Sequence, residues 1–343
     1  MNSPLEFALD TFGDVTVGPD GQRLTQPEVI RNVLDEAVLA DQVGLDYIGL
    51  GEHHRDDFAI SAPEPILGAI AARTSRIRFG TAVTVLSSDD PIRLFQRFAT
   101  LNALSGDRAE VILGRGSFTE SFPLFGMDLK DYEGLFNEKL DLFTRLIREK
   151  SVTWSGRTRP PLKAQKVYPP LGAAGLKVWI GMGGSPESVL RAVSHELPMM
   201  MAIIGGAPAR FRPFVDLYHR AHDQAGTRPQ ALGVHSPGHI ADSDQTARDQ
   251  LWPGYRALHD RIGRERGWPP TSRDSFEHEA DHGSLYVGAP ETVARKIVAT
   301  VKALGVQRFE LKYSSGTLAH PHLMRSIELY GTRVAPLVRD MLA

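Results

Sequence analysis

The sequence predicts a (β/α)8 TIM barrel that occupies residues 1–343 as one domain. Three observations support this α/β fold class. Short runs of β-branched and apolar residues alternate with longer stretches of helical period, eight such runs can be counted, and no linker, low-complexity tract or repeat divides the chain. A doubly wound parallel sheet would show the same alternation, but the number of strands favours the closed barrel.

The strands are predicted from their composition and from the helix starts that follow them. We place them at residues 5–12, 46–52, 77–86, 109–114, 178–183, 199–204, 231–241 and 308–314. The first helix is expected to begin at Thr25-Gln-Pro-Glu28, which has capping-box spacing and a proline in the first turn. Further helices are expected where a capping residue precedes proline, at Asp90-Pro91, Ser185-Pro186 and Ala289-Pro290, and alanine is the weakest of these caps.

Two connections are too long to be simple turns, and they follow the fourth and the seventh predicted strands. They cover residues 151–177 and 262–284, and both are rich in tryptophan, glycine or proline. Long excursions in a compact domain usually cover a functional site or form an interface. The sequence leaves open which of the two reaches the site.

The composition excludes several classes of protein. A formal charge of −2 provides no field to attract nucleic acid or anionic lipid, so neither partner is expected. No apolar run approaches the ~20 residues of a membrane span, and Glu6 and Asp10 interrupt the region where a secretory signal would be apolar, so we expect a soluble, cytoplasmic protein. The absence of cysteine excludes disulfides, thiolate nucleophiles and cysteine-ligated metals.

The end of the second predicted strand carries the motif Gly51-Glu52-His53-His54. Active sites of this barrel lie at the carboxyl-terminal ends of its strands. Barrel hydrolases commonly take two metal ligands from one strand, which requires every second residue because side chains alternate between the faces. His53 and His54 are adjacent and would point to opposite faces, so no metal site is predicted. Without other motifs, one histidine in a loop and one in the packing would explain this pattern equally well.

Two further motifs have the chemistry of a phosphate site. Gly114-Arg115-Gly116-Ser117, at the end of the fourth strand, places a guanidinium between flexible residues, and arginine binds phosphate through charge-assisted, bidentate bonds. Gly183-Gly184-Ser185 follows the fifth strand and leads into a helix start, where unpaired N–H groups favour anions. A surface arginine and an ordinary helix cap are the alternatives. Together the two motifs supply the halves of a monophosphate site.

The third strand contains Gly80-Thr81-Ala82-Val83, where small residues would let a planar ligand approach the backbone or would serve a tightly packed barrel layer. With this strand the order of motifs resembles the luciferase-like flavin monooxygenase superfamily. The shared order is E-H-H after strand two, G-T-A-V in strand three, D-P-I-R at the next helix, R-G after strand four, and a phosphate turn after strand five. The similarity spans nearly the whole chain and, through GGSPESVLRA and ELKYSSG, is greatest to the FMN-type oxidoreductase branch.

This resemblance implies a reaction and a set of residues. Reduced FMN from a separate flavin reductase would be used with O2 to oxygenate a small organic substrate, in a chain that commonly forms dimers. The family's cis peptide against the isoalloxazine would be Ala82–Val83, and its oxygen-handling histidine would be His53, whose proton exchange we expect near neutral pH. The predicted cofactor-binding residues are Thr81, Ala82, Val83, Arg115, Ser117, Gly183, Gly184 and Ser185. Phe12, Phe118 and Phe122 would line the substrate space or belong to the core.

Several alternatives remain open at this stage. Light-emitting members carry a cysteine before the phosphate arginine, whereas this chain has Gly114, so luminescence is poorly supported. Some members of the superfamily bind a deazaflavin instead of FMN and act as hydride-transfer dehydrogenases without oxygen. Other barrel relatives bind flavin without turnover. A metal-dependent barrel hydrolase ranks last because of the histidine spacing, and the sequence does not indicate the organic substrate.

Overall fold

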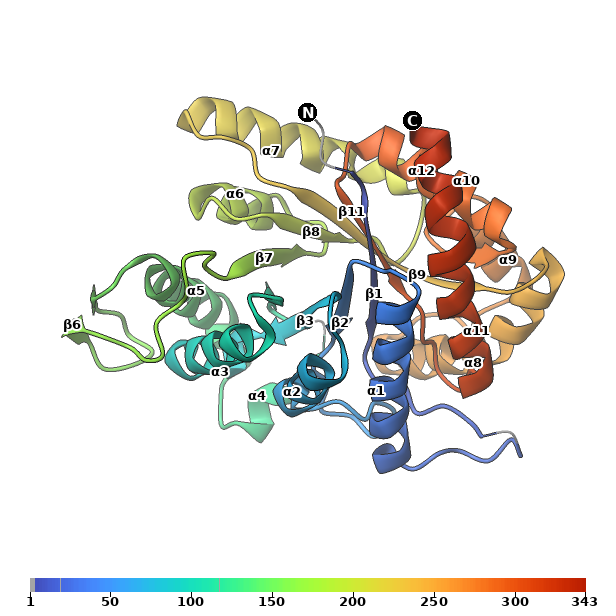
Figure 1. Cartoon of the computed structure of the whole chain (residues 1–343), viewed down its shortest axis with the longest axis horizontal. Coiled ribbons are helices and arrows are strands. Elements are labelled where there is room, and N and C mark those ends of the chain that lie inside the picture. Colours follow the sequence, from blue (N-terminus) through green and yellow to red (C-terminus); the bar gives the residue numbers. More distant parts are fainter. Residues whose placement is uncertain (1–3, 19, 117) are drawn as a thin grey trace.

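The computed structural model describes residues 4–18, 20–116 and 118–343 of the chain, and its centre is a closed barrel of eight parallel strands (Figure 1). Each strand pairs with the next, and the pairings of β8 with β9, β9 with β11 and β11 with β1 close the ring. All eight predicted strands are present, and the predicted fold class is confirmed. The barrel strands are β1 (Glu6–Thr11), β2 (Tyr47–Leu50), β3 (Arg78–Val85), β4 (Ala109–Gly114), β7 (Lys177–Met182), β8 (Met199–Ala202), β9 (Leu232–Ile240) and β11 (Arg308–Lys312).

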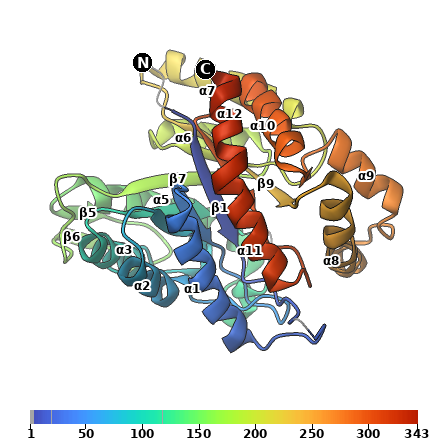
Figure 2. The ribbon, with the colours of Figure 1, turned by 45° about the vertical axis from the view of Figure 1, so that its right-hand side comes forward.

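Helices surround the barrel on its outside (Figures 1 and 2). The main ones are α1 (Gln26–Gln42), α2 (Pro63–Arg73), α3 (Pro91–Ser105), α5 (Tyr132–Arg148), α6 (Pro186–Ser194), α7 (Arg212–Ala225), α10 (Pro290–Leu304), α11 (His320–Leu329) and α12 (Ala335–Leu342). The shorter ones are η1 (Leu86–Ser88), α4 (Ser121–Leu124), η2 (Leu129–Asp131), η3 (Pro208–Phe211) and the π-helical η4 (Tyr330–Val334).

The predicted helix starts are correct. The Glu28 carboxylate accepts a hydrogen bond from the backbone N–H of Thr25 at 2.8 Å, which is one of the two hydrogen bonds of a capping box. Asp90 and Ser185 cap their helices through their own side chains. Ala289 has no capping side chain of its own, and its N–H instead donates to Asp244 at 2.7 Å. The neighbouring helix therefore supplies the cap that the alanine lacks.

The two long connections contain structure that the sequence did not reveal. Residues 151–177 form the antiparallel hairpin of β5 (Val152–Trp154) and β6 (Leu162–Gln165), which leads from α5 into β7 and so lies at the amino-terminal end of the barrel. The connection after β9 contains α8 (Asp244–Arg266), α9 (Arg273–Asp281) and β10 (Tyr286–Gly288), and β10 extends the sheet along β9. This second excursion lies at the carboxyl-terminal end.

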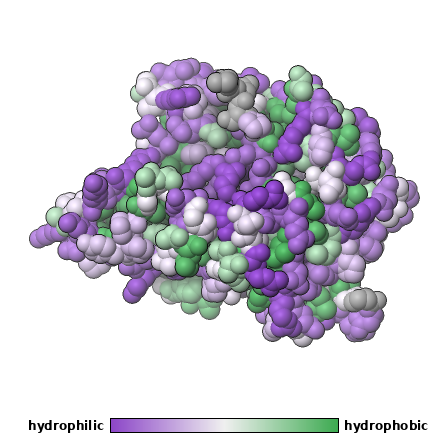
Figure 3. Space-filling model, in the orientation of Figure 1, coloured by the Kyte–Doolittle hydropathy of each residue, from purple (hydrophilic) through white to green (hydrophobic). Residues whose placement is uncertain are grey.

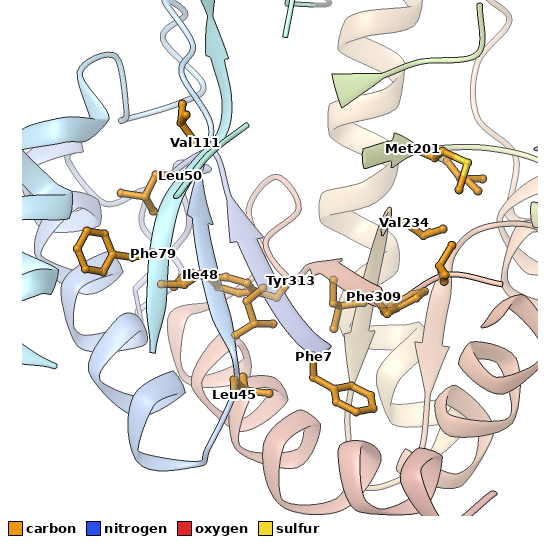
Figure 4. Close-up of a cluster of buried hydrophobic side chains, with 14 of the residues drawn as sticks. Phe7, Leu45, Ile48, Leu50, Phe79, Val111, Met201, Val234, Phe309 and Tyr313 are labelled. Atoms are coloured by element: carbon orange, nitrogen blue, oxygen red, sulfur yellow. The ribbon is translucent and has the colours of Figure 1, made fainter. Parts of the chain in front are cut away.

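Apolar side chains form two separate layers, because successive residues of a strand face opposite sides of the barrel wall. The outward-facing ones pack against the helices, as Phe7, Ile48, Phe79, Val111 and Phe309 do in Figure 4. The inward-facing ones form a smaller cluster inside the barrel, made of Ala8, Tyr47, Ala82, Ile112, Trp179 and Met200. The surface in Figure 3 is mainly hydrophilic, with scattered apolar residues.

A buried ion cluster fills the amino-terminal end of the barrel. Arg308 is fully buried, and its guanidinium lies 4.6 Å and 4.5 Å from the ring centroids of Tyr47 and Trp179. The same guanidinium pairs with Glu6 at 2.6 Å and Glu110 at 2.9 Å. Charges paired in this way tolerate burial, whereas a single unpaired one would be costly. A ligand must therefore enter from the opposite end of the barrel.

The approach of β3 to β4 makes glycine necessary at position 80. A Cβ on Gly80 would lie 2.0 Å from the carbonyl oxygen of Glu110, and neither backbone can move freely within the barrel wall. We therefore expect Gly80→Ala to lower the free energy of unfolding by about 2–3 kcal/mol, measured by urea denaturation. Gly205→Ala is the control, because a Cβ there meets no atom within 4 Å, and it should change stability by less than about 0.5 kcal/mol. Equal stability of the two variants would contradict this packing argument.

Candidate active site

The carboxyl-terminal ends of the strands, which we call the mouth of the barrel, are shaped by glycines around one peptide bond. This bond, Ala82–Val83, is cis, as predicted. A Cβ on Gly49 would lie 2.7 Å from Cβ of Ala82, and one on Gly114 would lie 2.5 Å from Cγ2 of Val83. Gly181 faces Val83 in the same way at 3.2 Å. Three neighbouring strands thus leave room for the ledge formed by Ala82 and Val83.

Thr81, beside this ledge, is placed differently from the prediction. Its side chain is fully buried, accepts a hydrogen bond from the Thr84 hydroxyl at 2.8 Å and donates to the carbonyl oxygen of Ile112 at 3.4 Å. Its own carbonyl oxygen accepts a bond from the Tyr47 hydroxyl at 3.1 Å. The hydroxyl of Thr81 therefore belongs to the barrel wall. Contacts of Ala82 and Val83 with a cofactor stay predictions.

His53 lies among aromatic rings at the mouth. Its imidazole centroid is 4.4 Å from the ring of Phe12, 4.7 Å from Phe58 and 5.1 Å from Phe118. Burial, helped by the nearby Lys312 charge, lowers the pKa of His53 to about 3. We expected proton exchange near neutral pH, and the enclosure overturns that expectation. The lowered pKa means that the neutral imidazole is favoured at physiological pH.

His53 and His54 lie beyond the end of β2 and line the same hollow, so the expectation that they point to opposite faces of a strand does not apply. Nε2 of His54 lies 2.9 Å from Oε1 of Glu52, and Oε2 of Glu52 accepts a hydrogen bond from the N–H of Val85 at 3.0 Å. The N–H of Glu52 also donates to the carbonyl oxygen of Val83 at 3.3 Å. His54 and Glu52 therefore fix the end of β2 to the end of β3, directly behind the ledge.

The two predicted halves of the phosphate site lie close together. The Arg115 guanidinium pairs with Glu133, whose other carboxylate oxygen is 3.1 Å from Nη2 of Arg191 on α6. Arg191 also donates to the Ser188 hydroxyl at 3.4 Å, and that hydroxyl lies 3.0 Å from the hydroxyl of Ser185. We call these five residues the arginine cradle. The structure thus connects the end of β4 to the first turn of α6 through charged and polar groups.

The sequence analysis missed Ser188 and Arg191. They stand three and six residues after the predicted cap Ser185, and this spacing places them on the same helix face. Gly184 has φ +108°, which a side chain would strain, and a Cβ on Gly183 would meet no atom within 4 Å, so both leave open space before the helix. Ser117, the remaining predicted cofactor residue, lies outside the described residues.

An ionic cluster around Arg55 holds two loops over His53. The guanidinium of Arg55 bonds both carboxylate oxygens of Glu265 at 2.8 Å, Glu120 at 2.9 Å and Asp57 at 3.0 Å. Glu265 lies at the end of α8, so the connection of residues 262–284, not that of 151–177, reaches the site. The cluster borders a small hollow of about 10 Å³, which is lined by Glu52, His53, His54, Val85, Gly116, Phe118, Glu120 and Ser121.

The three aromatic candidates have different positions. Phe118 lines the hollow, and Phe12 contacts His53. Phe122 is only 1% exposed and packs against Tyr132. Phe12 and Phe118 can therefore contact a ligand, whereas Phe122 belongs to the core.

Two carboxylates lie inside the barrel below the mouth, and the sequence analysis did not identify them as a pair. Asp10 and Glu310 are fully buried, and Oδ1 of Asp10 lies 2.9 Å from Nδ1 of His235. Neither oxygen of Glu310 has a hydrogen-bond partner among the described residues. Burial and the charge of Asp10 raise the pKa of Glu310 well above its ordinary value, so Glu310 is protonated.

Comparison with known proteins identifies the family. The model of the luciferase-like monooxygenase family matches residues 11–308. The chain belongs to the luciferase-like monooxygenase family. The 4-hydroxyprotoasukamycin monooxygenase of Streptomyces nodosus subsp. asukaensis is 27% identical over 321 residues, which cover 88% of this chain and 85% of that protein. Family membership makes the chain an oxidoreductase of the monooxygenase type.

Solved structures show that this luciferase-like fold is shared. The oxygenating constituent of 3,6-diketocamphane monooxygenase from Pseudomonas putida, solved in complex with FMN, has a TM-score of 0.78 at 20% identity and covers 97% of this chain and 99% of its own. An F420-dependent secondary alcohol dehydrogenase has a TM-score of 0.75 at 16% identity and covers 98% of this chain and 100% of its own.

Among the described residues, no helix has both the length and the apolar character of a membrane span.

The state of Glu310 can be tested by stability measurements at several pH values. In the unfolded chain this carboxyl ionises above about pH 4.5, whereas the folded barrel keeps it protonated, so the wild type loses stability as the pH rises above that value. Glu310→Gln does not titrate. We expect it to be more stable than the wild type at pH 8 and the difference to shrink towards pH 4, by up to about 1.4 kcal/mol per pH unit. A difference that does not change with pH would show that Glu310 ionises in the folded barrel as it does in the unfolded chain, and would contradict this prediction. Glu149→Gln, at an exposed carboxylate, is the control.

Proposed function

We propose that the chain is an FMN-dependent monooxygenase that uses reduced FMN and O2 to oxygenate a small organic substrate. The FMN phosphate would bind in the arginine cradle and the isoalloxazine would lie against Ala82 and Val83 at the mouth. The observation that carries this proposal is the convergence of Arg115 and Arg191 on the carboxylate of Glu133, beside Ser185 and Ser188 of α6.

The residues of the cradle fit a phosphate. Two guanidiniums share one carboxylate, that of Glu133, which is 57% exposed and can move away into solvent. Burial lowers the pKa of Arg191 although Glu133 is nearby, so Glu133 compensates the buried guanidinium charge only in part. An anion with more charge than a carboxylate, such as a phosphate, would therefore be favoured at this position. The hydroxyls of Ser185 and Ser188 and the N-terminal dipole of α6 add donors of the kind that phosphate needs. The FMN complex of the diketocamphane relative supports this choice of cofactor.

The remaining residues of the mouth would prepare the reaction. Reduced FMN supplies the two electrons with which O2 is activated. Ala82 and Val83 shape the surface for the flavin ring, and the rings of Phe12, Phe58 and Phe118 exclude water from the space beside it. The neutral imidazole of His53 can donate or accept one hydrogen bond there, because no described residue occupies its nitrogens.

The supply of the cofactor and the assembly of the protein belong to the same proposal. A separate flavin reductase would provide reduced FMN, and the chain would work as a cytoplasmic homo-oligomer, as the family resemblance implies. The hollow of about 10 Å³ has room for about one water molecule, whereas ligand pockets measure roughly 300–1,000 Å³, so binding there would require the Arg55 cluster to open.

Replacing Arg115 tests the cradle. Arg115→Ala removes a charge-assisted contact and should weaken FMN binding by ~1–3 kcal/mol, which corresponds to a five- to 150-fold higher Kd in a fluorescence titration. Arg145→Ala is the matched control, because Arg145 is exposed on α5 and, within the described part of the chain, forms an ion pair with Asp141 alone. An unchanged Kd in Arg115→Ala would refute the phosphate assignment.

Replacing His53 separates oxygen chemistry from flavin binding. His53→Gln should change the rate at which bound reduced FMN is reoxidised by O2, followed by stopped-flow absorbance, while the Kd for FMN stays within about twofold. Because the pKa of His53 is about 3, the wild-type rate should show no ionisation of this residue between pH 5 and 8. Reoxidation identical to the wild type would remove His53 from the reaction. Binding of a deazaflavin in preference to FMN would point instead to hydride transfer.

A further inference from the structure

A second histidine, His235, borders the mouth. In the order of the strands around the barrel, β9 with His235 lies on one side of β1 and Phe12, and β3 with the ledge lies on the other side. His235 is on β9, level with Glu310 of β11, and its Nδ1 lies 2.9 Å from Oδ1 of Asp10 on β1. At this distance the carboxylate accepts the Nδ1–H, and the bond fixes the tautomer in which Nε2 carries a lone pair. An aspartate that orients a histidine in this way is typical of a general base.

The surrounding charges support this arrangement. Glu310 lies 4.0 Å from Nδ1 of His235 and its raised pKa favours the neutral form, so Asp10, at 2.9 Å, is the nearer carboxyl group to the imidazole. Lys312, above Glu310 on the same strand, is held by Asp14 at 3.0 Å and lies 4.6 Å from the centroid of Phe12. Asp10 thus lies on the Nδ1 side of the His235 imidazole, and the positive charge of Lys312 lies beside the ring of Phe12.

The free nitrogen of His235 is accessible. No described residue forms a hydrogen bond with Nε2, and 11% of the side chain is exposed although the residue faces the inside of the barrel. Its ring is nearly parallel to that of Phe12, with an interplanar angle of 17° and centroids 6.4 Å apart. The same Phe12 ring is 4.4 Å from His53. His235 therefore borders the aromatic space of the proposed reaction site.

We propose that His235 is a general base that removes the hydroxyl proton of a phenolic substrate, with Asp10 as its positioning residue. This inference rests on the proposed function, because the substrate must lie in the mouth beside the flavin. The aromatic walls at Phe12, Phe58 and Phe118 favour a planar ring. A phenol in water ionises near pH ~10 and an imidazolium near ~6.5, so this transfer needs a positive charge that stabilises the phenolate, and Lys312 supplies one beside Phe12.

The step is a proton transfer and requires no oxidant. The O–H bond of the phenol breaks, an N–H bond forms at Nε2 of His235, and the electron pair stays on the substrate oxygen. The resulting phenolate has a more electron-rich ring, which favours attack on an electrophilic oxygen. Lys312 lies close enough to the aromatic space to stabilise the negative charge. Reduced flavin and O2 then supply the electrons and the oxygen atom, as in the proposed function.

The chromophore 4-nitrophenol tests the inference without flavin, because its anion and its neutral form absorb differently. At a pH below the probe's own pKa, wild-type protein should shift the bound probe at least tenfold towards the anion, relative to free solution. His235→Gln should abolish this shift, and His282→Gln, at an exposed histidine, should retain it. Absence of probe binding to the wild type, or an undiminished shift in His235→Gln, would overturn the proposal.

A measurement on the wild-type protein covers the case in which His235→Gln does not fold. With ¹⁵N-labelled histidine, NMR should show one imidazole that carries its proton on Nδ1 and gains a second on Nε2 when 4-nitrophenol binds. A proton already on Nε2 in the free protein would overturn the proposal. The proposal would also be overturned if the Nδ1–H form appeared only after treatment with EDTA. That result would show that a metal cation is bound between the carboxylates of Asp10 and Glu310 and His235.

A parallel FMN titration of the same samples distinguishes the two proposals. Flavin binding without ionisation of the probe would overturn the role of His235 and leave the flavin assignment intact. Ionisation of the probe without flavin binding would overturn the proposed function and leave the basic character of His235 intact. An Asp10→Asn variant should reduce the probe shift at least tenfold, because the amide no longer offers a charged acceptor to Nδ1.

Discussion

The contact between the Ala82–Val83 ledge and the strands around it is the constraint on which the site depends. Gly49, Gly114 and Gly181 each come so close to the ledge that a Cβ would overlap it or press against it. A neighbouring strand can approach the side chains of Ala82 and Val83 this closely only where it has no side chain of its own, so each of the three strands has glycine at that position. The result is a smooth wall at the mouth, where a planar ring can approach the backbone.

The two ends of the barrel divide its tasks. At the amino-terminal end, Arg308 and its carboxylate partners fill the interior with paired charges, and large aromatic side chains cover them. At the carboxyl-terminal end, paired charges around Arg55 and aromatic rings border a wall of small residues. His53 and His235 lie there on either side of Phe12, and both have nitrogens without partners among the described residues. The candidate functional groups are therefore concentrated at the carboxyl-terminal end, and the amino-terminal end is closed by the Arg308 ion cluster.

Much of this could be predicted from the sequence, because strand composition, helix caps and the order of short motifs are local signals. The eight strands, the cis peptide and the convergence of Arg115 with Ser185 were all expected. The lowered pKa of His53 was not, because it depends on burial by rings that include the distant Phe12 and Phe118 and on the charge of Lys312. Asp10, His235 and Glu310 also remained hidden. Asp10 is 225 residues from His235, all three lie on different strands, and only barrel closure joins them.

The central claim is that the arginine cradle binds the phosphate of FMN, and a comparison of FMN with riboflavin tests it most directly. Riboflavin has the same ring and ribityl chain but no phosphate. The account predicts that the wild-type protein binds FMN at least tenfold more tightly than riboflavin, because each charge-assisted bond contributes roughly 1.5–3 kcal/mol. Equal affinities for the two flavins, measured in the same titration buffer, would contradict it.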